Sequence, residues 1–158
     1  MRTGTAVLLA GATVSAAVAA VGVTRLRQEA RHQRERNEVA LAQNQMAWLT
    51  QVSTDPAVAE KWRPAGVGVE EYMGLMSANL MLCTLSLRVR LGFVSEDQLD
   101  LYASMVMDSA VARRYWERFG PLRVQEAGTD PLAVRVNAAL AQAAARATRA
   151  DRQGEPAA

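Results

Sequence analysis

The sequence predicts an all-α protein, in which one N-terminal transmembrane helix continues into a stalk and then into an irregular bundle of about five helices. Three observations predict this architecture. The chain opens with a neutral, apolar segment; Ala and Leu, which favour helix, are abundant; and no run alternates apolar and polar residues as a half-buried strand would. The predicted division is a transmembrane anchor (residues 1–24), a charged stalk (25–38), a helical bundle domain (39–150) and a disordered tail (151–158).

The anchor is predicted from the segment Thr3–Thr24, which contains no charged residue. A helix over this segment extends roughly 33 Å at about 1.5 Å per residue, enough to cross a hydrocarbon core of about 30 Å. An arginine cluster follows it directly, whereas only Arg2 precedes it. Because basic residues beside a span stay in the cytoplasm, we expect the N-terminus outside and the domain in the cytoplasm. The arginine cluster that flanks the membrane consists of Arg25, Arg27, Arg31, Arg34 and Arg36.

A cleaved signal peptide is the rival interpretation of this segment. Ala17-Val18-Ala19 has the small residues of a cleavage site, and removal of residues 1–19 would give a secreted helical protein. The arginine cluster favours the uncleaved anchor. Cys83 is the only cysteine, which excludes an internal disulfide and fits a reducing compartment.

The first helix of the domain is expected to continue from the stalk, because residues 24–53 contain neither Pro nor Gly. Its apolar residues share one face for about three turns, too few for a long coiled coil. Asp55 and Pro56 then predict the N-cap and first position of a short helix that ends near Trp62. A loop follows at residues 64–68.

The next helix should be the central, most buried one. It begins at Glu70 and is uncharged from Tyr72 to Leu87, which is short for a second membrane span. Gly92 is expected to cap its C-terminus.

Three further helices are predicted from their caps. Ser95 and Gln98 form a capping box, Asp108 or Ser109 begins a helix that ends at Gly120-Pro121, and a last helix runs from Pro131 to about Ala150. The large residues expected in the core are Met46, Leu49, Trp62, Tyr72, Leu75, Met76, Leu80, Cys83, Leu87, Leu99, Tyr102, Met105, Trp116 and Phe119.

No catalytic, cofactor-binding or metal site is expected, and the chain is predicted not to be an enzyme. His32 lies in the stalk, away from any apolar pocket, and Cys83 lies within the most apolar helix, where a buried structural thiol is expected. Glu96, Asp97 and Asp100 could form a weak cation site, but acidic residues belong in the first turn of a helix. The net charge of +2 gives no reason to expect nucleic acid.

Two functional hypotheses follow. The first is a non-enzymatic interaction module at the cytoplasmic face of a lipid bilayer, with an unknown protein partner and homo-oligomerisation left open. Its partner surface would include Arg113, Arg114, Trp116 and Arg118, although these aromatic residues could instead pack inward. The second is a small-ligand-binding domain, with an apolar pocket beside Asn79 on a helix that carries Met73, Met76 and Met81.

Several segments are similar to an uncharacterised family of actinobacterial proteins, domain of unknown function family 6082. The similar segments are an Asn- and Gln-rich stretch (Asn37, Gln43, Asn44, Gln45), DPAVAEKW at Asp55–Trp62, NLMLCTLSLRVRLGFVSEDQL at Asn79–Leu99, and RRYWERFG at Arg113–Gly120. The resemblance implies a membrane-associated helical protein. It supplies no catalytic residues.

Overall fold

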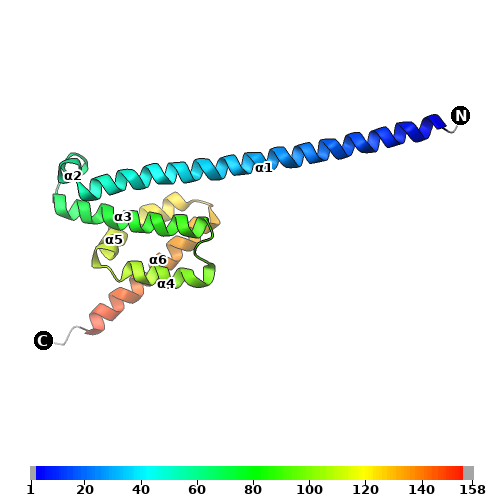
Figure 1. The fold of residues 1–158 in the computed structure, drawn as a ribbon. Coiled ribbons are helices and arrows are strands. Elements are labelled where there is room, and N and C mark those ends of the chain that lie inside the picture. The colour runs from blue at the N-terminus through cyan, green and yellow to red at the C-terminus, as the bar shows by residue number, and fades with distance from the viewer. Residues whose placement is uncertain (1–2, 155–158) are drawn as a thin grey trace. The chain divides into compact units, whose positions relative to one another are not determined.

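The computed structural model describes the backbone of residues 3–154 and the side chains of residues 25–153 except Glu35. All regular structure in this range is helical, which confirms the predicted all-α class (Figure 1). The chain divides into two compact units, residues 1–41 and residues 42–158. The helices are α1 (Thr3–Thr54), α2 (Pro56–Trp62), α3 (Val69–Arg90), α4 (Glu96–Met107), α5 (Ala110–Ala127) and α6 (Pro131–Gly154).

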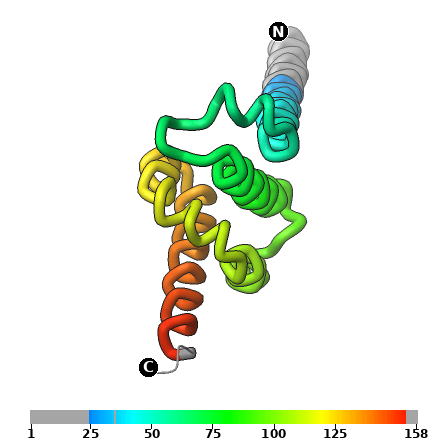
Figure 2. The backbone as a smooth tube through the Cα atoms, turned by 90° about the vertical axis from the view of Figure 1, so that its left-hand side faces the viewer, coloured from blue at the N-terminus to red at the C-terminus, as the bar shows by residue number. Residues whose placement is uncertain are grey.

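The first unit consists of the N-terminal part of α1. Its described side chains between residues 25 and 38 are exposed, and Arg25 pairs with Glu29 one turn later at 3.4 Å. Among the residues described, no helix is both long enough and apolar enough to span a bilayer. The predicted anchor, residues 1–24, lies outside the residues whose side chains are described (Figure 2).

The second unit has α3 at its centre, as the uncharged run in the sequence predicts. α3 packs against α2, α4, α5 and α6, and its neighbours contribute Leu49, Met107 and Leu140 to the same core. The end of α1 also contacts α3, where Thr84 lies 3.7 Å from the sulfur of Met46. The buried side chains of α3 are Tyr72, Leu75, Met76, Ala78, Leu82 and Leu85.

The predicted helix ends are confirmed where a specific side chain or glycine defines them. The Asp55 carboxylate accepts hydrogen bonds from two backbone amides at the start of α2, and Gln98 accepts one from the Ser95 amide before α4. Gly92 has a φ of +75° after the end of α3. Its amide bonds to the Val89 carbonyl at 3.0 Å and that of Phe93 to the Arg88 carbonyl at 2.9 Å, which is a Schellman motif.

The prediction that a helix ends at Gly120-Pro121 is wrong, because α5 continues through Pro121 to Ala127. Proline removes one backbone hydrogen bond, but Glu117 and Pro121 are exposed, so water can satisfy the freed carbonyl. The turns after Pro121 are held by packing, since Ala127 is buried and Asn137 of α6 donates to the Arg123 carbonyl at 2.9 Å.

Two predicted core residues are largely exposed. Met105 is 60% exposed, because α4 turns Leu99, Ala103 and Met107 inward, at intervals of four. Trp62 is 59% exposed and lies edge-on against Trp48, with ring centroids 6.0 Å apart.

The last helix extends beyond its predicted end. Residues 151–154, assigned to the disordered tail, belong to α6, and Asp151 bonds to Arg113 of α5 at 2.9 Å. Residues 155–158 of that tail lie outside the described residues. Ala139 and Ala143 are buried, so small side chains allow α6 to lie close to its neighbours.

Candidate functional site

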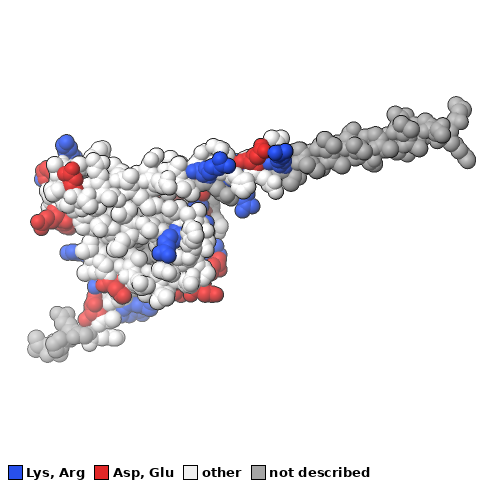
Figure 3. Space-filling view, viewed as in Figure 1, with Lys and Arg blue, Asp and Glu red and all other residues white. Residues whose placement is uncertain are grey.

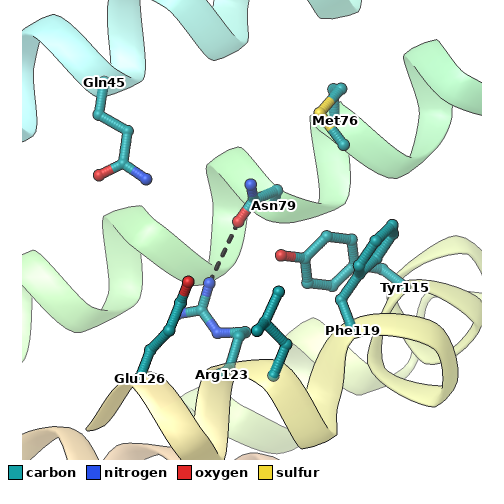
Figure 4. Close-up of a pocket in the computed structure, with 8 residues that line it drawn as sticks. Gln45, Met76, Asn79, Tyr115, Phe119, Arg123 and Glu126 are labelled. Carbon is teal, nitrogen blue, oxygen red and sulfur yellow. Dashed lines mark hydrogen bonds between the residues drawn. The ribbon is translucent and has the colours of Figure 1, made fainter. Parts of the chain in front are cut away.

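A pocket of about 220 Å³ lies within the second unit, between the C-terminal part of α1, the middle of α3 and α5 (Figure 4). Polar and apolar side chains both line it. We call it the Arg123 pocket, and its lining residues are Gln45, Met76, Asn79, Tyr115, Phe119, Leu122, Arg123 and Glu126.

Helical spacing brings these side chains together. Met76 and Asn79 are three residues apart on α3, and residues this far apart share a helix face. On α5, Tyr115, Phe119 and Arg123 recur at intervals of four, and Glu126 follows three residues later. The face of α5 that forms the pocket therefore crosses Pro121 and exists only because the helix continues.

Arg123 is the central polar group of the pocket. Its Nη1 donates to Oδ1 of Asn79 at 3.1 Å and lies 3.8 Å from the sulfur of Cys83. Its Nε is buried and has no hydrogen-bond partner in the structure. In the part of the chain that the structure describes, no carboxylate forms an ion pair with Arg123.

A half-buried guanidinium without a paired anion is energetically costly, because neutral partners replace only part of its hydration. Burial lowers the pKa of Arg123, but its contacts with Cys83 and Tyr115 outweigh this effect and the net shift is upward. The side chain is therefore positively charged at any physiological pH.

Tyr115 provides a second donor in the pocket. Burial raises the pKa of its phenol above the ordinary value of 10.0, and the nearby Arg123 opposes that rise only in part. The hydroxyl is thus protonated near neutral pH and can donate a hydrogen bond.

Cys83 lies behind the Arg123–Asn79 contact and is half-buried. Its thiol lies 3.4 Å from Oδ1 of Asn79, and Nε2 of Gln45 lies 3.8 Å from its sulfur. The thiol is therefore part of a polar network that links α1, α3 and α5.

The remaining lining residues divide into an acidic group and an apolar wall. Glu126 is exposed, in contrast to the half-buried Arg123. Met76, Phe119 and Leu122 supply the apolar surface. The pocket therefore offers one cation, one anion and an apolar wall, and it can bind a small amphiphilic molecule through all three.

The sequence predicted a pocket beside Asn79, and the structure has one there. Met76 lines it, but Met73 packs against the core and Met81 is 41% exposed. The lining is apolar only in part, because Arg123 and two amide side chains add polar groups to the apolar side chains.

The four residues of the predicted partner surface do not share one face. Arg113 turns inward, where Nη1 donates to the Met107 and Asp108 carbonyls at 2.7 and 2.9 Å. Trp116 packs against the core. The two residues that are exposed together are Arg114 and Arg118, one turn apart on α5.

The other residues considered from the sequence are solvent-facing. Every arginine of the cluster is exposed, as is His32. The acidic residues of α4 do not gather into a metal site: Glu96 pairs with Arg135 of α6, and no group of metal-ligating side chains occurs among the residues described.

Sequence reasoning missed the residues that α5 contributes, above all Arg123. The spacing of Tyr115, Phe119, Arg123 and Glu126 places them on one helix face, but only if α5 continues through Pro121.

A family of unknown function (DUF6082) matches residues 2–157. The chain belongs to this family. The match confirms the resemblance and extends it well beyond the similar segments, so that all lining residues of the Arg123 pocket lie within the DUF6082 region. No curated protein and no solved structure matches the chain.

Proposed function

We propose that this chain is a single-pass membrane protein whose non-enzymatic helical domain faces the cytoplasm and binds a protein partner there. The observation that carries this proposal is the neutral segment Thr3–Thr24 followed directly by the arginine cluster. The continuity of α1 from Thr3 to Thr54 supports it, because a single helix can leave the membrane and enter the domain without a loop.

The surface of the second unit supports a partner-binding role. Leu101 and Met105 are 61% and 60% exposed and lie one turn apart on α4, so they form an apolar strip. On the face shown in Figure 3, uncharged side chains cover much of this unit, and most charged groups lie toward its edges. Such a surface suits a protein partner, or a second copy of the chain, better than nucleic acid.

Fusions to the C-terminus in a bacterial host test the topology. We expect green fluorescent protein to fluoresce and alkaline phosphatase to be inactive, with the intact full-length mass in the membrane fraction. Active phosphatase, together with a mature chain that begins near Ala20, would instead show a secreted protein. Replacement of the arginine cluster by Gln should lower the fraction of chains that insert with the domain in the cytoplasm. The same replacement of the α6 arginines should leave this fraction unchanged.

The molecular mass of the chain in lipid nanodiscs tests the binding role. The wild-type chain should be recovered with a partner or as an oligomer, whereas the double variant Leu101→Ser with Met105→Ser should be recovered as a monomer. Leu26→Ser with Leu41→Ser, on the first unit, is the matched control. A wild-type chain that is always a lone monomer would contradict the interaction role.

A second candidate function is small-ligand binding by the same domain. The specific observation that favours it is the Arg123 pocket, with a half-buried cation that has no ion-pair partner in the described chain. Binding of small probes to the full chain tests it.

A further inference from the structure

We propose that the Arg123 pocket binds a small zwitterion with an apolar substituent, of the size and charge of a single apolar amino acid. This inference rests on the small-ligand candidate function and names the chemical class of the ligand.

The carboxylate is inferred from the unsatisfied charge of Arg123. Asn79 accepts from Nη1, but Nε has no hydrogen-bond partner and no described carboxylate forms an ion pair with the guanidinium. A planar guanidinium matches a carboxylate with two parallel donors, which makes this pairing favourable. The protonated hydroxyl of Tyr115 lines the same pocket and can donate to the same group.

The ammonium group is inferred from Glu126. An exposed carboxylate in the lining would repel a simple anion, which weakens the case for a ligand with negative charge only. A ligand that also carries a cation turns this repulsion into attraction. Arg123 and Glu126 together give the lining no net charge, as a zwitterion requires.

The apolar substituent and its size follow from the wall and the volume. Met76, Phe119 and Leu122 present hydrocarbon and thioether surface, and methionine adapts to varied shapes. The volume of about 220 Å³ is below the range of about 300–1,000 Å³ that is usual for drug-sized ligands. The ligand should therefore resemble leucine or phenylalanine in size.

The test measures binding of four probes to the full chain in nanodiscs by saturation-transfer NMR. The probes are L-leucine, 4-methylpentanoate, which lacks the amine, 3-methylbutylamine, which lacks the carboxylate, and 3-methylbutan-1-ol, which lacks both charges. We expect leucine to bind most tightly. Loss of the carboxylate should weaken binding about tenfold or more, and loss of the exposed amine contact about two- to fivefold.

Two variants assign these effects to residues. Arg123→Met should make leucine and 3-methylbutylamine bind equally weakly. Glu126→Gln should make leucine and 4-methylpentanoate bind equally. Glu117→Gln, an exposed acid elsewhere on α5, is the matched control and should leave all four affinities unchanged. If Arg123→Met does not fold, the Glu126 variant and the wild-type probe series still decide the question.

The outcomes separate this inference from the function on which it rests. Equal binding of leucine and the alcohol would overturn the zwitterion and leave a small-ligand site standing. No binding of any probe at millimolar concentration would overturn both. Tighter binding of 4-methylpentanoate than of leucine would also contradict the inference, because Glu126 would then have no ammonium to attract.

Discussion

The guanidinium of Arg123 on α5 donates from Nη1 to the amide oxygen of Asn79 on α3 at 3.1 Å. This contact fixes the direction of a half-buried cation through a neutral partner. An amide replaces a hydrogen bond to water but does not cancel a charge, so the arrangement holds Arg123 in place without neutralising it. We expect such a residue to lower the stability of the domain in the absence of a ligand.

Replacement of Arg123 by Met should therefore be neutral or should raise the free energy of unfolding by about 1–2 kcal/mol, because it removes a partly desolvated charge without an ion-pair partner in the described chain and keeps most of the volume. Urea unfolding followed by circular dichroism measures this. Arg118→Met, on the exposed face of the same helix, should change stability by less than about 0.5 kcal/mol. A loss of more than about 2 kcal/mol for Arg123→Met would show that the residue is mainly structural.

Alanine substitutions of Gly74 within α3 and Gly92 just after it should change stability with opposite signs. Gly92 has a φ of +75°, so Gly92→Ala should destabilise the domain by about 1–2 kcal/mol. Gly74 lies inside the helix, where an added Cβ meets Val111 Cγ1 at 3.4 Å, an ordinary contact. Gly74→Ala should therefore stabilise by up to about 1 kcal/mol through helix propensity. Thermal unfolding of both variants measures the two changes in stability, and changes of the same sign would contradict the cap assigned to Gly92.

Adjacent arginines on α5 should differ in their contribution to stability. Arg113 donates to two carbonyls at the end of α4 and bonds to Asp151 of α6, whereas Arg114 is exposed. Arg113→Met should cost about 1–3 kcal/mol. Arg114→Met should cost less than about 0.5 kcal/mol. If chemical denaturation finds the two equal, the contacts of Arg113 do not join the helices in solution.

Asp130 should make stability depend on acidic pH. A hydrogen bond from Arg90 lowers the pKa of its carboxyl below 3.8, partial burial opposes this, and the amides of Ala133 and Leu132 lower it further. The lowered pKa means that its contribution is complete above pH 3.8 and is lost as the pH falls through the folded-state value.

Asp130→Asn isolates this effect, because Asn can still cap α6 but carries no charge. At neutral pH the variant should be less stable by about 0.2–1 kcal/mol, as is usual for an exposed pair. The difference should shrink as the pH falls below 3.8. Urea unfolding over a series of pH values measures it, and a difference that grows on acidification would contradict the assignment.

Local signals in the sequence were sufficient to predict most of the helices. Asp55, Ser95 with Gln98, and Gly92 each act through bonds to nearby backbone, so their effect does not depend on the rest of the fold. The central position of α3 was also predictable, since a helix without charge on any face has to be covered.

The sequence was less informative where distant contacts decide the structure. Pro121 ends a helix in most settings, and only the contacts of Arg123 and Ala127 with other helices carry α5 past it. The side of α4 that faces inward depends on its neighbours, so spacing alone could not show which of Met105 and Met107 is buried. The pocket beside Asn79 was predicted from α3. Its charged side chains belong to α5 and could not be predicted.

The position of the single cysteine has a practical consequence for work in cells. Cys83 does not line the pocket, but its sulfur lies 3.8 Å from Nη1 of Arg123, so a molecule that holds Arg123 in place should slow the reaction of this thiol with alkylating reagents. With no second thiol in the chain, the yield of one maleimide adduct by mass spectrometry would report occupancy directly. The unmodified protein thus carries its own footprinting probe, usable without an engineered label.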